Sequence, residues 1–331
     1  MPDLASRAEE ALLGALIAQP DQITSVSSLE AADFTDPARQ AVWTAIKRLS
    51  DIASGATGPE FADVIHATSD NDHITYDYLT RLAVAAPTPG AADVYARMVL
   101  EANLIRDFAD DLANRAGTGQ DGDAAVSDAA ASYSRNITAA REAAADDLRE
   151  PGPPPADPGA LREERFLAAL MRQPDLTEWI SLDPDTLTSS ARRDIYQAIV
   201  ALNRHGEPID DLTLAWALAR STATRDVHEG RTTTPESFAA AIPPGTIARL
   251  AATSTDTVTA LEIGRDLLAD HARAQIAAAV NGSPQRHTPT VSPTTTEAQQ
   301  RRMLASGTGQ PLLQPPQQQN PSGPQLRQEG S

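Results

Sequence analysis

Cysteine is absent from the 331-residue sequence. Its absence excludes disulfide scaffolds, thiol nucleophiles and zinc or iron–sulfur sites with cysteine ligands. Lysine is almost absent too, because Lys47 is the only one and arginine supplies nearly all of the positive charge. A phosphate loop of the form G-x-x-x-x-G-K-[ST] needs a lysine directly after a glycine-rich run. Lys47 follows Ile46 without such a run, so the sequence predicts no standard phosphate loop and no ATPase motor in this chain.

Long apolar runs are scarce as well. No stretch approaches the ~20 consecutive apolar residues that span a bilayer, and the N-terminus lacks the basic-then-apolar layout of a signal peptide. We therefore expect a cytoplasmic protein with no membrane partner. The six histidines are scattered, and none is spaced for a zinc site. Paired acids such as Glu9-Glu10, Asp110-Asp111 and Asp210-Asp211 are expected at helix starts or on solvent-exposed faces, so we predict no catalytic residues, no metal and no cofactor.

Basic residues are outnumbered by acidic ones, 27 to 45, and the formal net charge is −18. Binding to duplex DNA is driven mainly by lysine and arginine, which displace the counterions of the phosphates. Direct DNA binding is therefore disfavoured. The acidity is typical of a well-solvated surface, and an acidic docking surface is the alternative.

What is abundant is alanine together with proline, of which there are 25, and this composition favours helices separated by breakers. Ser6-Arg7-Ala8-Glu9 has the pattern of a capping box, which predicts a helix start. Asp36-Pro37 predicts another start. Helical periodicity from Ala92 to about Ala116, and an alanine-rich stretch from Asp123 to about Arg149, predict a long antiparallel hairpin.

Two changes in composition suggest how the chain is divided. Five of the residues from 149 to 159 are proline, which predicts a semi-rigid linker at 150–159. Threonine, proline, glutamine and serine dominate from 282 to 331, which predicts a disordered C-terminal tail. The domains expected on this basis are residues 1–149 and residues 160–281.

An internal repeat is the strongest signal in the sequence. Residues 9–21, Glu-Glu-Ala-Leu-Leu-Gly-Ala-Leu-Ile-Ala-Gln-Pro-Asp, match residues 163–175 at an offset of 154. Residues 38–46 match residues 191–199 at an offset of 153, and a weaker match places Arg265 in register with Arg97. The repeat predicts an all-α protein of two tandem small helical bundles, the first of which carries the long hairpin.

The order of motifs in the first copy is specific. Glu-Glu-Ala-Leu-Leu-Gly-Ala-Leu ends in Gln-Pro-Asp, and is followed by Asp36-Pro37-Ala38-Arg39, the helix of Trp43 and Ile46, and then Tyr95-Ala96-Arg97-Met98-Val99. This order resembles the N-terminal domain of DnaB-type replicative DNA helicases, over most of residues 6–149 and, more weakly, 160–280. The resemblance implies an all-helical head whose hairpin pairs subunits into a collar that receives the primase of the primosome.

The second copy departs from this family pattern because no returning arm follows its long helix. We therefore expect the two heads to pack as a pseudo-dimer within one chain. Taken with the missing phosphate loop, the resemblance indicates a non-catalytic protein of the replication apparatus that binds a replicative helicase, a primase or a loader. Two alternatives stay open: the collar subunit of a split helicase whose motor is on another chain, and a structural protein that self-associates through the hairpin.

Candidate partner-contacting residues lie at the start of the hairpin and in its second-copy counterpart: Tyr95, Arg97, Met98, Leu104, Arg106 and Arg265. Arginine is favoured at protein interfaces. The alternative for the hairpin arginines is pairing with nearby acids such as Asp93, Glu101 or Asp107. The alternative for Tyr95, Met98 and Leu104 is a place in the core or in the hairpin seam.

Overall fold

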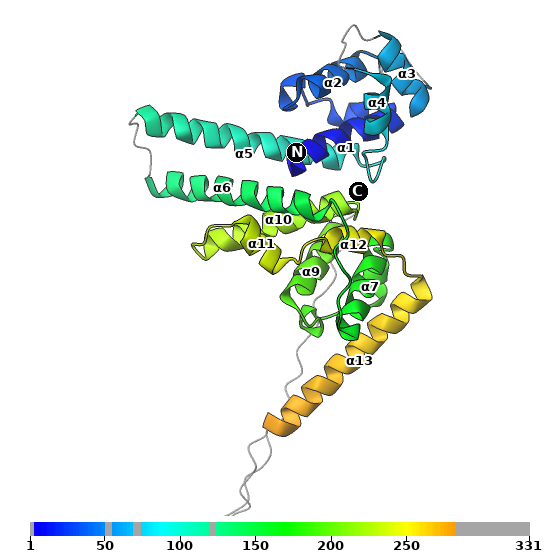
Figure 1. Cartoon of the computed structure of the whole chain (residues 1–331), viewed down its shortest axis with the longest axis vertical. Coiled ribbons are helices and arrows are strands. Elements are labelled where there is room, and N and C mark those ends of the chain that lie inside the picture. Colours follow the sequence, from blue (N-terminus) through cyan, green and yellow to red (C-terminus); the bar gives the residue numbers. More distant parts are fainter. Residues whose placement is uncertain (1–2, 50–54, 69–73, 119–123, 283–331) are drawn as a thin grey trace, which may run out of the picture. The chain divides into compact units, whose positions relative to one another are not determined.

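The computed structural model describes residues 3–49, 55–68, 74–118 and 124–282. Every regular element within these ranges is a helix, and none of the described residues lies in a strand (Figure 1). This confirms the all-α prediction. None of the described helices is both long enough and apolar enough to cross a membrane.

The first copy and its hairpin contain the following elements, in which η denotes a 3₁₀ helix: α1 (Leu4–Ala18), η1 (Pro20–Val26), η2 (Ala31–Asp33), α2 (Pro37–Leu49), α3 (Pro59–Thr68), α4 (Tyr76–Ala83), α5 (Ala92–Thr118) and α6 (Ala124–Asp147). The predicted cap at Asp36 is confirmed, because its carboxylate accepts the Ala38 amide at 2.7 Å. The predicted capping box at Ser6 is wrong. Helix α1 begins earlier, where the Asp3 carboxylate accepts the Ser6 amide at 2.7 Å.

Helix α1 is the centre of the first copy. It packs against α2, α4 and α5, so apolar side chains around most of its circumference are fully buried, among them Leu12, Leu13, Leu16 and Ile17. Gly14 permits the close approach of α4, because a Cβ atom at this position would lie 2.1 Å from the Leu82 carbonyl oxygen. Burial on several sides explains why α1 carries an apolar run rather than a narrow stripe.

The second copy contains the following elements: α7 (Pro158–Arg172), α8 (Leu176–Trp179), η3 (Pro184–Thr186), α9 (Ser190–Arg204), α10 (Asp211–His228), α11 (Pro235–Ala241), α12 (Thr246–Ala252) and α13 (Thr257–Gly282). Helix α7 repeats α1, and α9 repeats α2, with Ser189 capping α9 where Asp36 caps α2. The chain is therefore two tandem helical bundles, as the repeat predicts.

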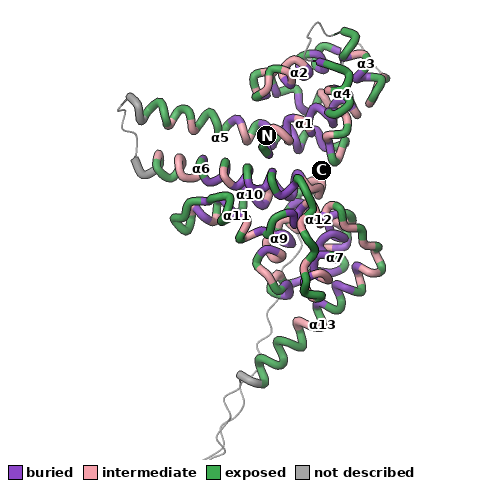
Figure 2. The backbone as a smooth tube through the Cα atoms, viewed as in Figure 1, coloured by how far each residue is buried: buried purple, intermediate pink, exposed green. Residues whose placement is uncertain are grey.

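The hairpin of α5 and α6 joins the two copies. The two helices lie side by side (Figure 1), and α6 packs more extensively against α10 of the second copy than against α5. Ile137, Ala140 and Ala144 of α6 are fully buried. Exposure increases along both helices toward the turn of the hairpin (Figure 2). The returning arm of the first copy is thus also a core helix of the second.

Contacts group Met1–Ile276 in one compact unit and Ala277–Ser331 in another, of which the structure describes the end of α13. The predicted linker falls between the end of α6 and the start of α7, where the Gly152 amide donates to the Gly245 carbonyl at 3.0 Å. A domain boundary at 150–159 stays a prediction. Apart from Gly282, the predicted tail lies outside the described residues.

Candidate protein-interaction surface

A buried ion pair joins α1 to α2 in the first copy. Glu9 is only 2% exposed, and its carboxylate lies 2.6 Å from the Arg39 Nε atom. The same carboxylate accepts the Thr35 amide at 3.0 Å and the Thr35 hydroxyl at 2.9 Å. The prediction that Glu9 belongs to a surface pair at a helix start is therefore wrong, because the arginine and threonine donors compensate the cost of its burial.

The second copy repeats this arrangement. The Glu163 carboxylate lies 2.5 Å from the Arg192 Nε atom and accepts the Thr188 amide at 3.2 Å and the Thr188 hydroxyl at 3.1 Å. The signal that could have revealed both pairs is present in the sequence, since the glutamate and the arginine recur in register in the two copies. The glutamate–arginine pair therefore stabilises the bundle of each copy, and its glutamate is buried.

Tyr95 lies at a joint between the copies. Its side chain is fully buried, its hydroxyl donates to the Asp210 carboxylate at 2.8 Å, and the same hydroxyl accepts the Thr88 amide at 3.0 Å. The other carboxylate oxygen of Asp210 accepts the Thr213 amide at 2.8 Å and so caps α10. Tyr95 therefore connects α5 to the start of α10, which is the partner that the sequence did not identify.

This joint predicts a dependence of stability on alkaline pH. Burial, followed by the neighbouring Asp210 carboxylate, raises the pKa of Tyr95 far above its ordinary value of 10, and burial raises the pKa of Tyr78 to about 12. Because these phenols ionise more readily in the unfolded chain, their contribution to the free energy of unfolding should be constant below about pH 10 and should fall as the pH rises above it. Urea unfolding at several pH values measures this, and the Tyr95→Phe variant should show a shallower fall. An equal fall in both proteins would contradict it.

Glu101 of α5 forms a second contact between the two copies. Its carboxylate lies 2.7 Å from the Arg141 guanidinium of α6 and accepts the Trp216 indole N–H of α10 at 3.2 Å. The Arg141 guanidinium stacks 3.8 Å above the centre of the Trp216 ring, in the geometry of a cation–π contact. Three helices thus meet in one charged and aromatic cluster, and neither Glu101 nor Trp216 was predicted to make these contacts.

The other predicted candidates fall in different settings. Arg97 is 58% exposed and lies 3.8 Å from the Asp93 carboxylate and 3.2 Å from that of Glu207 in the second copy. Met98 is buried beside this contact and lines a small cavity of about 220 Å³. Arg97 therefore pairs both with a nearby acid, as its alternative predicted, and with the second copy.

Arg106 and Arg265 make no comparable link between the copies among the described residues. The Arg106 guanidinium donates to the Asn103 side-chain oxygen on its own helix, and Arg265 is exposed on α13. Leu104 is 71% exposed, so among the predicted candidates it is the apolar side chain that faces solvent. Tyr95, Arg97 and Met98 thus lie at the contact between the two copies. Leu104, Arg106 and Arg265 are exposed to solvent.

An exposed apolar stripe runs along α5, and we call Leu100, Leu104 and Phe108 the α5 stripe. These side chains are 38%, 71% and 43% exposed and recur every four residues, which places them on one face of the helix. Leu268 and Ile276, 39% and 65% exposed, occupy the equivalent positions of α13. Exposed contiguous apolar faces mark sites of protein interaction.

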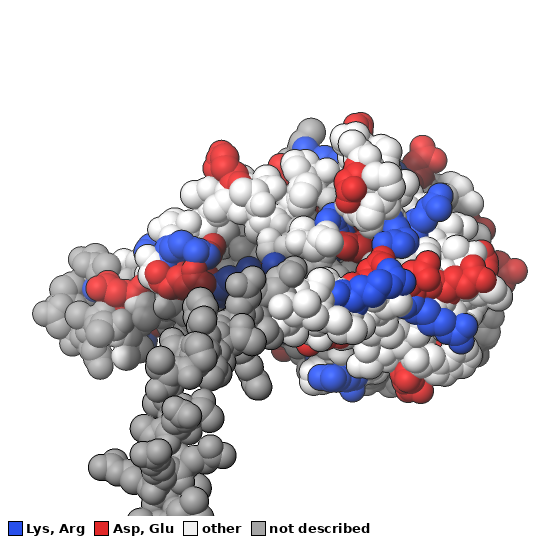
Figure 3. Space-filling view, turned by 90° about the horizontal axis from the view of Figure 1, so that it is seen from below, with Lys and Arg blue, Asp and Glu red and all other residues white. Residues whose placement is uncertain are grey.

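The charged side chains are mixed in sign on the face that Figure 3 presents. Figure 3 shows acidic and basic side chains interspersed over the face it presents, without a continuous basic patch. Among the described residues, no cluster of three histidine, aspartate or glutamate side chains has the geometry to hold a metal ion. The α5 stripe is therefore the candidate binding surface that the exposed side chains indicate.

The chain is a pair of tandem all-helical bundles with an exposed apolar face on α5. The family described as the DnaB-like helicase N terminal domain matches residues 2–101 and 159–250. The chain therefore belongs to the DnaB-like helicase N-terminal domain family and carries this domain twice, which links it to replicative helicases and to protein–protein interaction. No curated protein and no solved structure matches the chain.

Proposed function

We propose that this chain is a non-catalytic interaction protein of the DNA-replication apparatus. It binds a replicative helicase, a primase or a helicase loader in the cytoplasm and acts within or beside the primosome. The observation that carries the proposal is the α5 stripe, an exposed apolar face on the hairpin of a helicase-family head. A hydrophobic helix face of this kind fits the apolar face of a partner helix.

The mode of action that we propose is competition or bridging. In this chain α6 is already packed against α10, so the second copy covers one face of the hairpin. The α5 stripe remains available to a partner. A chain that offers one free hairpin face can occupy a site on a helicase assembly without extending a ring of identical heads. The second head, with its own exposed residues on α13, would leave room for a second contact.

The test is size-exclusion chromatography with light scattering of the protein alone and mixed with the replicative helicase, primase or loader of the same cell. The proposal predicts co-elution with at least one of them at a fixed stoichiometry. Co-elution with an ATPase motor that lacks its own N-terminal head would instead assign the chain to the collar of a split helicase. An unchanged mass with every partner, together with self-association, would favour a structural protein.

The proposal also predicts that the purified chain hydrolyses no ATP, with or without single-stranded DNA. Its only lysine, Lys47, lies in α2 and follows no glycine-rich loop. Phosphate release should equal that of a protein-free control. Turnover that persists through stringent purification would contradict the absence of catalysis.

A further inference from the structure

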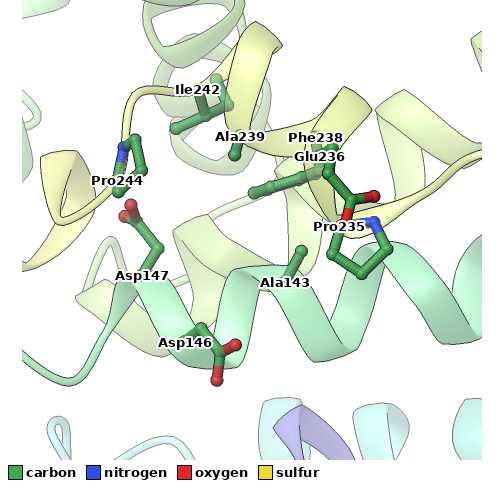
Figure 4. A pocket seen from close by; sticks show the side chains of 9 residues that line it. All are labelled: Ala143, Asp146, Asp147, Pro235, Glu236, Phe238, Ala239, Ile242 and Pro244. Carbon is green, nitrogen blue, oxygen red and sulfur yellow. The ribbon is translucent and has the colours of Figure 1, made fainter.

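A groove separate from the α5 stripe opens between the end of α6 and the segment from α11 to α12 (Figure 4). Its volume is about 360 Å³, which is within the range of ligand sites in proteins. Its floor is apolar and consists of Ala143 from α6 and Phe238, Ala239 and Ile242 from the α11 side. Because α6 belongs to the first copy and α11 to the second, the groove exists only where the copies meet.

The walls of this groove are fixed. The buried Asp147 carboxylate accepts the Ile247 amide at 2.7 Å and the Thr246 amide at 3.2 Å, which ties the end of α6 to the start of α12. Pro235 and Pro244 stand at the rim, where the ring of each restricts the backbone. A preformed groove loses little conformational entropy when a ligand enters.

The rim of this apolar groove is acidic. Glu236 is exposed in the first turn of α11, and backbone and Thr234 hydrogen bonds lower the pKa of its carboxyl group, which keeps it ionised at neutral pH. Asp146 of α6, 64% exposed, also borders the groove, but its carboxylate pairs with the Arg149 guanidinium at 2.8 Å, so Glu236 is the acid at the rim that the cation of a ligand would meet. The net charge of the chain, −18, has the same sign as the rim.

We propose that the groove binds a short segment of a partner protein in which aliphatic side chains directly follow arginine or lysine. The aliphatic side chains would pack against Ala239 and between Pro235 and Pro244, the lining residues that keep exposed surface, and the cation would lie against Glu236. An acidic peptide or a nucleic acid would meet repulsion at this rim. The inference does not depend on the proposed replication role, since any partner with such a segment fits.

Fluorescence polarisation with a labelled peptide Gly-Ser-Arg-Arg-Leu-Leu-Ser-Gly tests the proposal on the full chain. We expect saturable binding, and we expect Glu236→Lys to weaken it at least about tenfold, because the rim charge is inverted. Ala239→Trp, which fills the groove, should weaken binding to a similar extent. The matched control is Glu60→Lys, since Glu60 is also exposed and also follows a proline at the start of a helix. It should change the dissociation constant less than about twofold.

Two further peptides separate the contributions of charge and apolar contact. Replacing both arginines with glutamate, or both leucines with serine, should abolish binding to the wild-type chain. Equal binding of the three peptides, equal effects of Glu236→Lys and Glu60→Lys, or no binding of the Arg-Arg-Leu-Leu peptide would overturn the proposal. None of these outcomes affects co-elution with a helicase or primase, so failure here is distinguishable from failure of the proposed function.

Discussion

Replacing Arg39 with leucine will lower the free energy of unfolding by about 3–5 kcal/mol, the range for removing one partner of a buried ion pair. The Glu9 carboxylate would stay buried and would keep its Thr35 donors, but it would lose the guanidinium at 2.6 Å. Urea unfolding followed by circular dichroism measures the change. Arg192→Leu should have a similar effect, because Glu163 is held in the same way in the second copy.

Arg48→Leu is the matched control for this prediction. Arg48 lies on the same helix as Arg39, but it is exposed and donates to the Thr68 carbonyl at 3.0 Å. Surface changes of this kind usually alter stability by less than about 0.5 kcal/mol. If Arg39→Leu cost no more than Arg48→Leu, the repeated acid–arginine pair would not be a main support of the bundle.

The second large effect concerns partner binding. The double variant Leu104→Arg/Phe108→Arg should weaken the complex with the helicase, primase or loader by at least about a hundredfold, since it places two charges at the centre of the α5 stripe. Both side chains are exposed, 71% and 43%, so the fold should be retained. Co-elution and surface plasmon resonance measure the loss, and thermal unfolding verifies the fold.

Val84→Arg is the control for this variant, because Val84 is 79% exposed in the first copy and lies outside the α5 stripe. It should bind the partner as the wild type does. Equal loss in the control would indicate a general effect of added positive charge. Undiminished binding by the double variant would assign the partner contact to another surface, and the proposed role of the α5 stripe would be abandoned.

The helices of the hairpin can be predicted from the spacing of their apolar residues, but the burial of each face cannot. Apolar residues from Ala92 onward repeat at helical spacing, so the sequence predicts a long helix, and the structure has α5 over Ala92–Thr118. The same pattern does not distinguish Tyr95, which is fully buried, from Leu104, which is 71% exposed. Periodicity defines the faces of a helix, but the element that covers each face depends on tertiary contacts with residues far away in the sequence, here Asp210.

Buried charge limits the prediction in a different way. Adjacent acids near a helix start are usually solvated, and for this reason Glu9 was expected at the surface. Its burial depends on three donors from Thr35 and Arg39, which are brought to it only by the fold. The cross-copy cluster of Glu101, Arg141 and Trp216 is similar, since no local pattern relates α5, α6 and α10.

The two helicase-type copies pair within one chain through α6 and α10. Isotopically light and heavy chains, mixed and treated with a carboxyl-reactive cross-linker, test it most directly, since acidic side chains are abundant and Asp146 and Glu236 border the same groove. Mass spectrometry distinguishes links within a chain from links between chains. If the copies pair within one chain, links between α6 and residues 211–241 will join peptides of the same isotopic label. Equally abundant mixed-label links would show that the copies pair between chains.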